Sequence, residues 1–113
     1  MSALKAQARW LREVVRIPGR DMTLRQLAVL MAGRFEPQRF GIAEMSKDME
    51  VPPVAITRAV EFLVSEGLIR RTHDDDDRRR VVLALTPRGN RHLDDLADLA
   101  AHAASSIPQG AVK

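Results

Sequence analysis

Apolar residues recur along this chain at the spacing of helices, and the clearest example lies near its middle. Over residues 53–66 they stand at Ile56, Ala59, Val60 and Leu63. This i, i+3, i+4, i+7 spacing places all four side chains on one face of a helix, where a core can bury them. The pattern therefore predicts an amphipathic helix that ends close to a glycine.

The pattern becomes that of a β-hairpin directly after this helix. Leu68 and Ile69 are followed by polar residues, by aspartates at 74–77 and by arginines at 78–80. A second apolar strand then follows at 81–85. Aspartate favours turns because its carboxylate bonds nearby backbone N–H groups. The aspartates are therefore expected to make the turn. A helix that runs directly into a basic hairpin is the construction of a winged-helix DNA-binding domain.

The charges of this hairpin allow a second interpretation. Arg70, Arg71 and the arginines at 78–80 are the nearest cations to the four carboxylates, so a charge-paired turn is expected, with each exposed pair contributing only ~0–1 kcal/mol. A charge run by itself more often indicates a solvated tip without a partner. The aspartates predict no metal site, since the glycine and the distal glutamate of a calcium loop are missing at the required spacing.

Four further helices are predicted around this pair of elements. The first covers about residues 3–17 and ends at Pro18 and Gly19. Its apolar stripe consists of Leu4, Ala8, Leu11 and Val15. The second runs from Thr23, which serves as its N-cap, to about Arg34. Its expected buried set is Leu24, Leu27, Ala28, Leu30 and Met31.

The remaining two helices flank the helix at 53–66 and its hairpin. A loop at 35–40 is expected first, with Phe35 and Phe40 closing over the core, and a third helix follows from there to about Met49. The last helix begins with Thr86 as cap and Pro87 as first residue. Its expected inner face consists of Leu93, Leu96, Ala97, Leu99, Ala100, Ala103 and Ala104.

Length and composition fit one small domain over residues 1–113. The chain is 45% hydrophobic but only 4% aromatic, so its core is expected to consist of aliphatic side chains on packed helices. The predicted fold class is mainly α with a small β-hairpin wing. There is no cysteine, no apolar run of ~18 residues that could cross a bilayer and no signal-peptide core, so we expect a cytoplasmic protein with no membrane partner.

Positive charge is concentrated in the N-terminal third. The net charge is +3 and the pI is about 10.2, which suits an anionic partner. On the first helix, Lys5, Arg9, Arg12 and Arg16 form a basic stripe beside the apolar one. This stripe suits DNA phosphates or an acidic protein surface, and an ordinary solvated helix face is the alternative.

Local motifs of the hairpin resemble the MarR family of winged-helix transcriptional regulators. Family wings commonly read D-P-x-D-R-R and then, after a strand, L-T-x-x-G. This chain has DDDDRR at 74–79 and LTPRG at 85–89, and only Asp75, in place of proline, departs from the pattern.

The helices before the hairpin extend the resemblance to about residues 23–89. FGIAEMSKDM at 40–49 is similar to the first helix of the family's helix-turn-helix, L-T-x-x-E-L-A, and VPPVAITR at 51–58 to its turn and recognition helix, L-S-x-S-T-V-S-R. LRQLAVL at 24–30 resembles the L-T-x-x-Q-x-x-V-L helix. No single motif is diagnostic, but their order and spacing together are fairly specific.

The resemblance implies a winged helix-turn-helix whose N- and C-terminal helices pack as a dimerisation element. The terminal helices would be residues 3–17 and 87–105, and the DNA-binding core 23–86, with the wing at about 68–85. The implied dimer contacts are Leu4, Leu11, Leu93, Leu96 and Leu99, and packing of the same two helices within one subunit is the alternative. The helices are shorter than is usual in the family.

The resemblance also implies a sequence-specific regulator that binds double-stranded DNA. The recognition helix would enter the major groove and the basic wing would lie on phosphates or in a minor groove. The residues expected at DNA are Val54, Ala55, Thr57, Arg58, Glu61, Arg71, Arg78, Arg79 and Arg80. Among these, Arg58 is the main candidate for a phosphate or guanine contact, and the alternative is a surface arginine that is paired with Glu61 or solvated.

The recognition helix departs from the family at its start. Pro52, Pro53, Val54 and Ala55 stand where small hydroxyl residues are common, which removes a hydroxyl cap and its hydrogen bonds. Val54 and Ala55 could contact thymine methyl groups instead, or they could belong to a buried helix start. The apolar start also favours the rival function, a winged-helix module that binds protein with little or no DNA binding.

Nothing in the sequence predicts catalysis, a cofactor or a metal site. His73, His92 and His102 have no partners that suggest a triad or a metal site, and they are expected at the surface or an interface. Trp10 is expected to pack at the edge of the terminal-helix contact, although a small-molecule pocket between that contact and the DNA-binding core would also use a tryptophan. Family members often respond to small ligands, but no residue here identifies such an effector.

Overall fold

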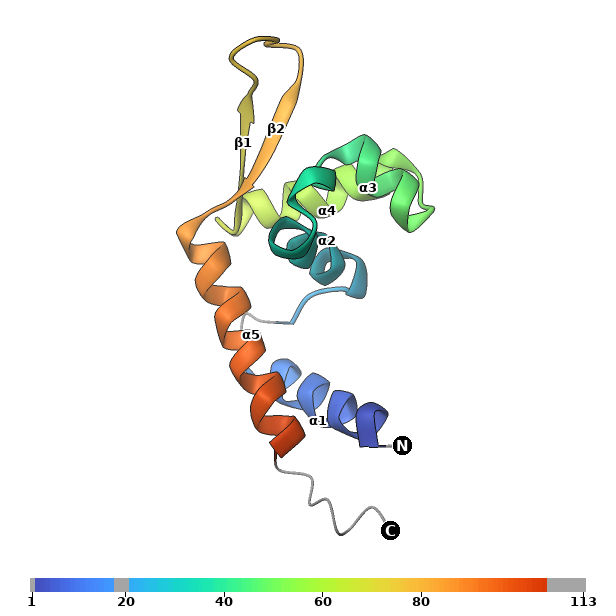
Figure 1. The fold of residues 1–113 in the computed structure, drawn as a ribbon, viewed down its shortest axis with the longest axis vertical. Helices are drawn as coiled ribbons and strands as arrows, with labels where there is room; N and C mark the ends of the chain where they lie inside the picture. The colour runs from blue at the N-terminus through green and yellow to red at the C-terminus, as the bar shows by residue number, and fades with distance from the viewer. Residues whose placement is uncertain (1, 18–20, 106–113) are drawn as a thin grey trace. The chain divides into compact units, whose positions relative to one another are not determined.

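The computed structural model describes residues 2–17 and 21–105 (Figure 1). Its elements, in chain order, are α1 (Ser2–Arg16), α2 (Leu24–Phe35), the 3-10 helix η1 (Pro37–Arg39), α3 (Ile42–Met49), α4 (Pro53–Ser65), β1 (Ile69–His73), β2 (Val81–Leu85) and α5 (Pro87–Ser105). The mainly helical fold with one hairpin is confirmed, and the helix bounds agree with the prediction within two residues. Pro18 and Gly19, which were predicted to end the first helix, lie outside the described residues. No helix in the described ranges is long and apolar enough to span a membrane.

The chain forms two compact units. One consists of residues 23–93, from α2 to the first part of α5, and the other of α1 with the rest of α5. We describe each unit by itself.

The core of the larger unit is built around α4. Ile56, Val60 and Leu63 are completely buried and Ala59 is 3% exposed, so the predicted inner face of this helix is confirmed. α4 packs against α2, α3 and β1. The buried residues of α4 all lie on this face, so the opposite face of the helix is available to solvent or to a partner.

The buried side of α2 differs from the prediction. Leu27 and Leu30 are buried as expected, but Val29 and Ala32 are buried too, and Leu24 is 81% exposed. The expected Ala28 and Met31 are only half-buried. The reason is that α2 contacts α4, β2 and η1, so it is covered from several sides, whereas periodicity assigns a single buried face. Leu24 is the first residue of the helix and lies beyond this cover.

The two phenylalanines after α2 also have different environments. Phe35 is 71% exposed, so its predicted place over the core is wrong: the helix continues through residue 35 and carries this side chain outward. Phe40 is half-buried. Its ring and Leu85 cover Gly33, where a Cβ atom would lie only 2.9 Å from Phe40 Cζ and 2.8 Å from Leu85 Cγ.

Both predicted threonine caps are present. Gln26 N donates to Thr23 Oγ1 (3.1 Å) while Thr23 N donates to Gln26 Oε1 (2.9 Å), a reciprocal capping box at the start of α2. At α5, Gly89 N donates to Thr86 Oγ1 (2.9 Å). The Thr86 hydroxyl also donates to the carbonyl of Gly67 (2.6 Å), which ties the start of α5 to the end of α4.

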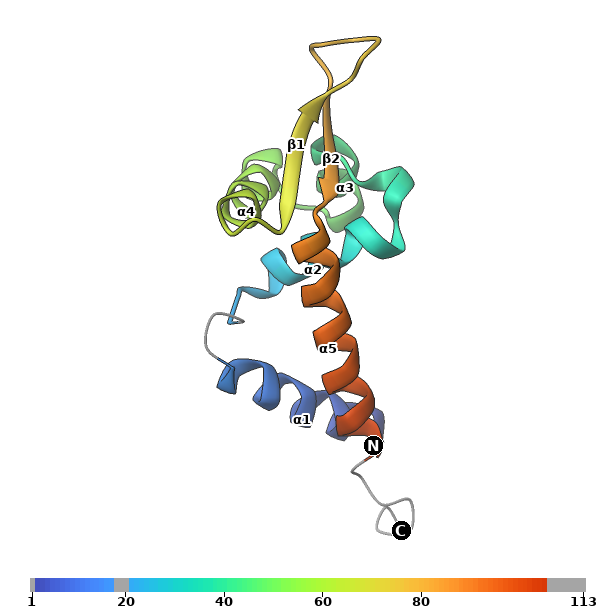
Figure 2. The same ribbon diagram turned by 90° about the vertical axis from the view of Figure 1, so that its left-hand side faces the viewer.

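The hairpin of β1 and β2, which we call the wing, is packed only at its base. The strands pair antiparallel, with Ile69 opposite Leu85 and His73 opposite Val81. Ile69 and Leu83 are buried, whereas the rest of β1 is exposed. Figure 2 shows the wing projecting beyond α3 and α4.

The smaller unit has little core of its own. Val14 of α1 and Leu96 and Ala103 of α5 are buried. Trp10 is half-buried, and its Nε1 donates to the Leu96 carbonyl (2.9 Å), in keeping with its predicted role in packing the terminal helices.

The three histidines differ in burial. His73 and His102 are exposed, whereas His92, for which a position at the surface or at an interface was predicted, is 8% exposed. It lies one helical turn before Leu96, on the side of α5 that is covered.

We predict that Gly89→Ala destabilises the protein. A Cβ atom at this position would collide with the carbonyl oxygen and carbon of Leu68, and backbone has little freedom to move away. Overpacking of this kind costs about 2 kcal/mol of the free energy of unfolding, measurable by urea denaturation.

Gly33→Ala is the matched control, since it is also a helical glycine with close neighbours. There the obstacles are the side chains of Leu85 and Phe40, which can turn aside, and alanine regains about 0.5–1 kcal/mol of helix propensity. Equal losses in the two variants would refute the role given to the Leu68 backbone.

Candidate nucleic-acid interface

A short turn joins α3 to α4. Glu50 ends α3 with left-handed backbone angles, φ 56° and ψ 46°. The Ser46 hydroxyl donates to the carbonyl of Val51 (2.6 Å), and Val51 N donates to the carbonyl of Ser46 (3.2 Å). These bonds close the turn, so that α3, the turn and α4 form a helix-turn-helix.

α4 then starts on two prolines. Pro53 is its first residue and Pro52 precedes it without a side-chain cap. A proline fits the first helical position because its missing N–H would have no partner within the helix there. The start of α4 therefore has no hydroxyl cap, as the sequence implied.

The exposed face of α4 brings together four of the five predicted recognition residues. Val54, Arg58 and Glu61 are spaced i, i+4 and i+7 and are all exposed, and the half-buried Thr57 lies beside them. Val54 is 56% exposed, so it does not belong to a buried helix start. Ala55 is half-buried at the edge of this face.

Local bonds of aspartates shape the tip of the wing. Asp76 N donates to Asp74 Oδ1 (2.9 Å) and Arg79 N donates to Asp77 Oδ1 (3.1 Å). Backbone bonds from Asp74 N to Arg80 O and from Arg80 N to Asp77 O, each 2.9 Å, close the loop. The turn-forming role predicted for the aspartates agrees with this geometry.

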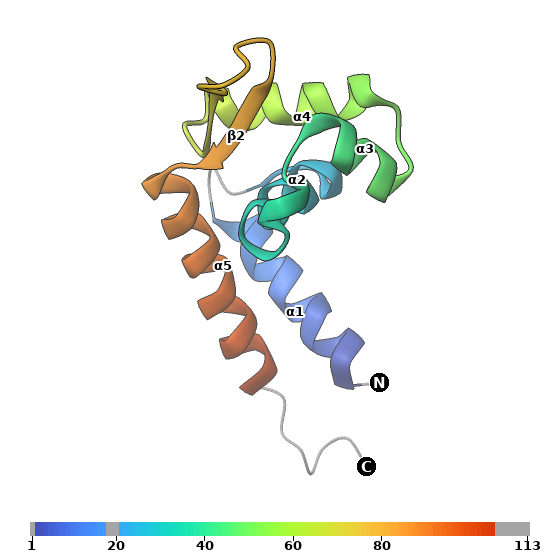
Figure 3. The same cartoon turned by 45° about the horizontal axis from the view of Figure 1, so that its top comes forward.

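The predicted charge pairing at the tip is mostly missing. In the described ranges, the one ion pair within the wing joins Arg79 Nε to Asp77 Oδ1 at 3.5 Å, and the Arg79 side chain is 94% exposed. The other predicted wing residues, Arg71, Arg78 and Arg80, are exposed as well. The wing therefore presents its arginines to solvent, and Figure 3 shows its base beside the end of α4.

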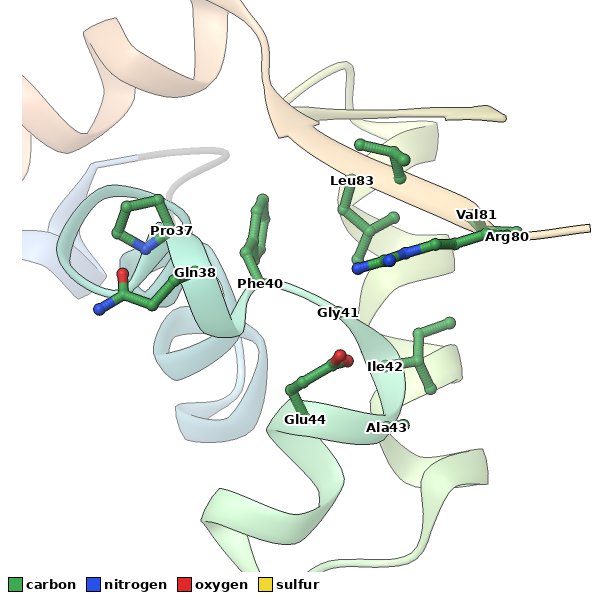
Figure 4. A pocket seen from close by; sticks show the side chains of 11 residues that line it. Pro37, Gln38, Phe40, Gly41, Ile42, Ala43, Glu44, Arg80, Val81 and Leu83 are labelled. Atoms are coloured by element: carbon green, nitrogen blue, oxygen red, sulfur yellow. The ribbon is translucent and has the colours of Figure 1, made fainter. Parts of the chain in front are cut away.

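A small hollow that the sequence did not indicate lies between the wing and the start of α3 (Figure 4). Its volume is about 410 Å³, and Phe40, Ile42 and Leu83 are among the residues that line it. Glu44 and Arg80 contribute opposite charges to its lining. No motif could have indicated it, because it joins residues some forty positions apart.

The described residues hold no group of three or more histidine, aspartate or glutamate side chains that could bind a metal ion.

The five residues predicted for dimerisation differ in their burial. Leu4 and Leu11 are 62% and 47% exposed, while Leu93 and Leu96 are 4% and 2% exposed. Leu99 is half-buried.

A helix-turn-helix followed by a projecting two-stranded wing defines the winged helix-turn-helix class of proteins. The sequence model of the MarR family matches residues 22–81. This chain belongs to the MarR family.

Known relatives agree with this assignment. The chain is 36% identical over 55 residues to the HTH-type transcriptional repressor MdtR of Bacillus subtilis, a stretch that covers 49% of this chain and 36% of the relative. Among solved structures, YusO of Bacillus subtilis has a TM-score of 0.72 at 28% identity, covering 97% of this chain and 78% of YusO. CouR of Rhodococcus jostii bound to p-coumaroyl-CoA has a TM-score of 0.65 at 25% identity, covering 95% of this chain and 73% of CouR.

We predict that Glu50→Gly stabilises the protein. The left-handed conformation costs a residue with a side chain roughly 1–2 kcal/mol, and glycine avoids this cost while losing about 0.5–1 kcal/mol to its greater freedom when unfolded. The free energy of unfolding should therefore rise by about 0.5–1 kcal/mol in urea denaturation. Glu50→Ala, which keeps the strain, should show no gain, and a gain in both variants would point to the lost charge instead.

Proposed function

We propose that this chain is a transcriptional regulator that binds specific sequences of double-stranded DNA. The main support for this proposal is the exposed face of α4, which lies opposite the buried face of the same helix. The projecting wing, with its exposed arginines, lies next to it. α4 would enter the major groove, and the wing would lie on phosphates or in the adjacent minor groove. The name of the repressor MdtR supports a function in transcription and favours DNA over the rival protein-binding module.

Each side chain on the face of α4 suits a particular contact. Arg58 can donate to guanine or to a phosphate, and Thr57 can make a weaker contact. Val54 and Ala55 suit thymine methyl groups, and Glu61 suits the amino group of cytosine. The wing arginines, Arg71 and Arg78 to Arg80, would supply affinity through phosphates rather than sequence preference.

We also propose that the regulator acts as a homodimer through its terminal helices. Leu4 and Leu11 support this, because they are large apolar side chains left exposed on α1. Leu93, Leu96 and Leu99 of α5 are more covered within the chain, so they would support the contact from beneath. A two-fold dimer would bind two symmetric half-sites.

A small-molecule effector completes the proposal, with no chemistry assigned to it. CouR was solved with p-coumaroyl-CoA bound, which supports a ligand-responsive regulator in this fold. No reaction is proposed for this chain.

Removing the exposed arginines should weaken DNA binding. Random duplex DNA is first selected on the purified protein to obtain its operator, and affinities are then measured over a range of salt concentrations. Arg79→Ala should weaken binding to all duplexes and lower the slope of log affinity against log salt by about 0.9, the effect of one lost phosphate contact.

Arg58→Ala should instead cost about 1–3 kcal/mol on the operator and reduce the preference at one base pair. The control is Arg25→Ala, which removes an exposed arginine from α2 and should change neither quantity. If the native protein bound no duplex even at low salt, the proposed function would be wrong and the same surface would be tested for protein partners.

The role of Val54 can be tested by removing a single methyl group from the DNA. Replacing thymine by uracil at the contacted position should weaken binding of the native protein by about 1 kcal/mol, roughly the contribution of one buried carbon group. Val54→Ala should lose most of this discrimination and keep the native salt dependence. Equal sensitivity to uracil in both proteins would exclude a methyl contact by Val54.

A further inference from the structure

The hollow between the wing and the start of α3 takes no part in the proposed contacts with bases. All the residues that line it belong to the larger unit. Leu83 is buried there, and Phe40 and Ile42 are half-buried. Its volume of about 410 Å³ is at the lower end of the range for small-molecule sites. The hollow therefore has the size and the apolar lining of a site for a small molecule.

Two opposite charges face this apolar lining. Figure 4 shows the Arg80 side chain extending from the wing across the hollow, and the Glu44 carboxylate pointing toward the same space from α3. In the described part of the chain, neither side chain takes part in an ion pair. The hollow therefore offers a guanidinium and a carboxylate that do not pair with each other.

The start of α3 holds the Glu44 carboxylate beside the hollow. Gly41 is the N-cap of this helix and provides no side-chain cap, and Glu44 is the acidic residue of the first turn. A Cβ atom at Gly41 would collide with Glu44 Oε1, so the carboxylate is folded back over the start of the helix. The helix dipole stabilises a negative charge at that position.

We propose that the hollow binds an α-amino acid with an apolar side chain. The ligand carboxylate accepts hydrogen bonds from Arg80, in the bidentate geometry that a guanidinium favours, and the ligand ammonium donates to Glu44. The ligand side chain packs on Phe40, Ile42 and Leu83. A ligand with only a negative charge is repelled by Glu44, and one with only a positive charge is repelled by Arg80. A zwitterion satisfies both groups at once.

This inference rests on the proposed regulator and names the class of its effector. Arg80 is also one of the wing arginines proposed to contact DNA phosphates. Its guanidinium cannot give the same N–H groups to a ligand carboxylate and to a phosphate. The amino acid and the operator therefore weaken each other's binding, and this coupling is reciprocal.

Phenylalanine and two analogues that each lack one charge test the site in the absence of DNA. Phenylpropionate lacks the ammonium and phenethylamine lacks the carboxylate. The native protein should bind L-phenylalanine at least about tenfold more tightly than either analogue, because each loses one charge-assisted hydrogen bond. NMR titration of the isotope-labelled protein measures the affinities and should shift the amide signals of residues 37–44 and 80–83, which line the hollow.

Neutral variants assign each charge to its partner. Arg80→Gln should abolish the preference for phenylalanine over phenethylamine, and Glu44→Gln the preference over phenylpropionate. The matched controls are Arg70→Gln, in an exposed wing arginine outside the hollow, and Glu50→Gln, at the other end of α3. Both controls should keep the native preferences.

Two results would overturn the inference. One is that phenylalanine, leucine and tryptophan all fail to give saturable shifts at the residues that line the hollow. The other is that the native preferences survive in both Arg80→Gln and Glu44→Gln, since the two charges would then have no part in binding.

Operator binding separates this inference from the regulator itself. Saturating phenylalanine should weaken operator binding of the native protein at least about fivefold, the low end of allosteric coupling, and should leave that of Arg80→Gln unchanged. A protein that binds the amino acid but no duplex would retain the site and lose the regulatory function. An operator affinity that does not respond to bound phenylalanine would overturn the competition for Arg80.

Discussion

The winged-helix unit depends on one crowded junction, where the start of α5 lies against the backbone between α4 and β1. The Thr86 hydroxyl donates to Gly67 O at 2.6 Å, and Thr86 N donates to Leu68 O at 3.1 Å. Gly89, without a Cβ atom, allows α5 to approach the Leu68 carbonyl. Because Ile69 and Leu85 pair next to this junction, it fixes where both strands leave the core. The position of the wing relative to α4 therefore follows from contacts that involve no wing arginine.

Local chemistry explains most of what the sequence predicted well. The inner face of α4, both threonine caps and the turn at residues 74–77 depend on neighbours within a few positions, so spacing and residue type indicate them. Two exposed residues of α2 show the limit of prediction from local sequence. Leu24 has the spacing and Phe35 the hydrophobicity expected of core residues, but burial depends on which distant elements cover each end of the helix.

The candidate interface was predicted in composition rather than in detail. Periodicity alone separates Val54, Arg58 and Glu61 from the buried face of α4, and this needed no tertiary information. The state of the wing charges could not be deduced in the same way, because the aspartates use their carboxylates on backbone N–H groups and leave most arginines in solvent. The hollow beside Phe40 and Arg80 could not be predicted from the sequence for a further reason, because the residues that line it come from separate elements.

The hydrogen bond of Trp10 makes the intrinsic fluorescence of the chain a probe of the smaller unit. Trp10 is the only tryptophan of the chain, which has no tyrosine, and its indole N–H is bonded to the Leu96 carbonyl of α5. Intrinsic fluorescence above 295 nm excitation therefore originates from a single site at the pairing of α1 with α5. Changes in its emission wavelength or quenching would report on the terminal helices without any label, separately from events at the recognition helix and the wing.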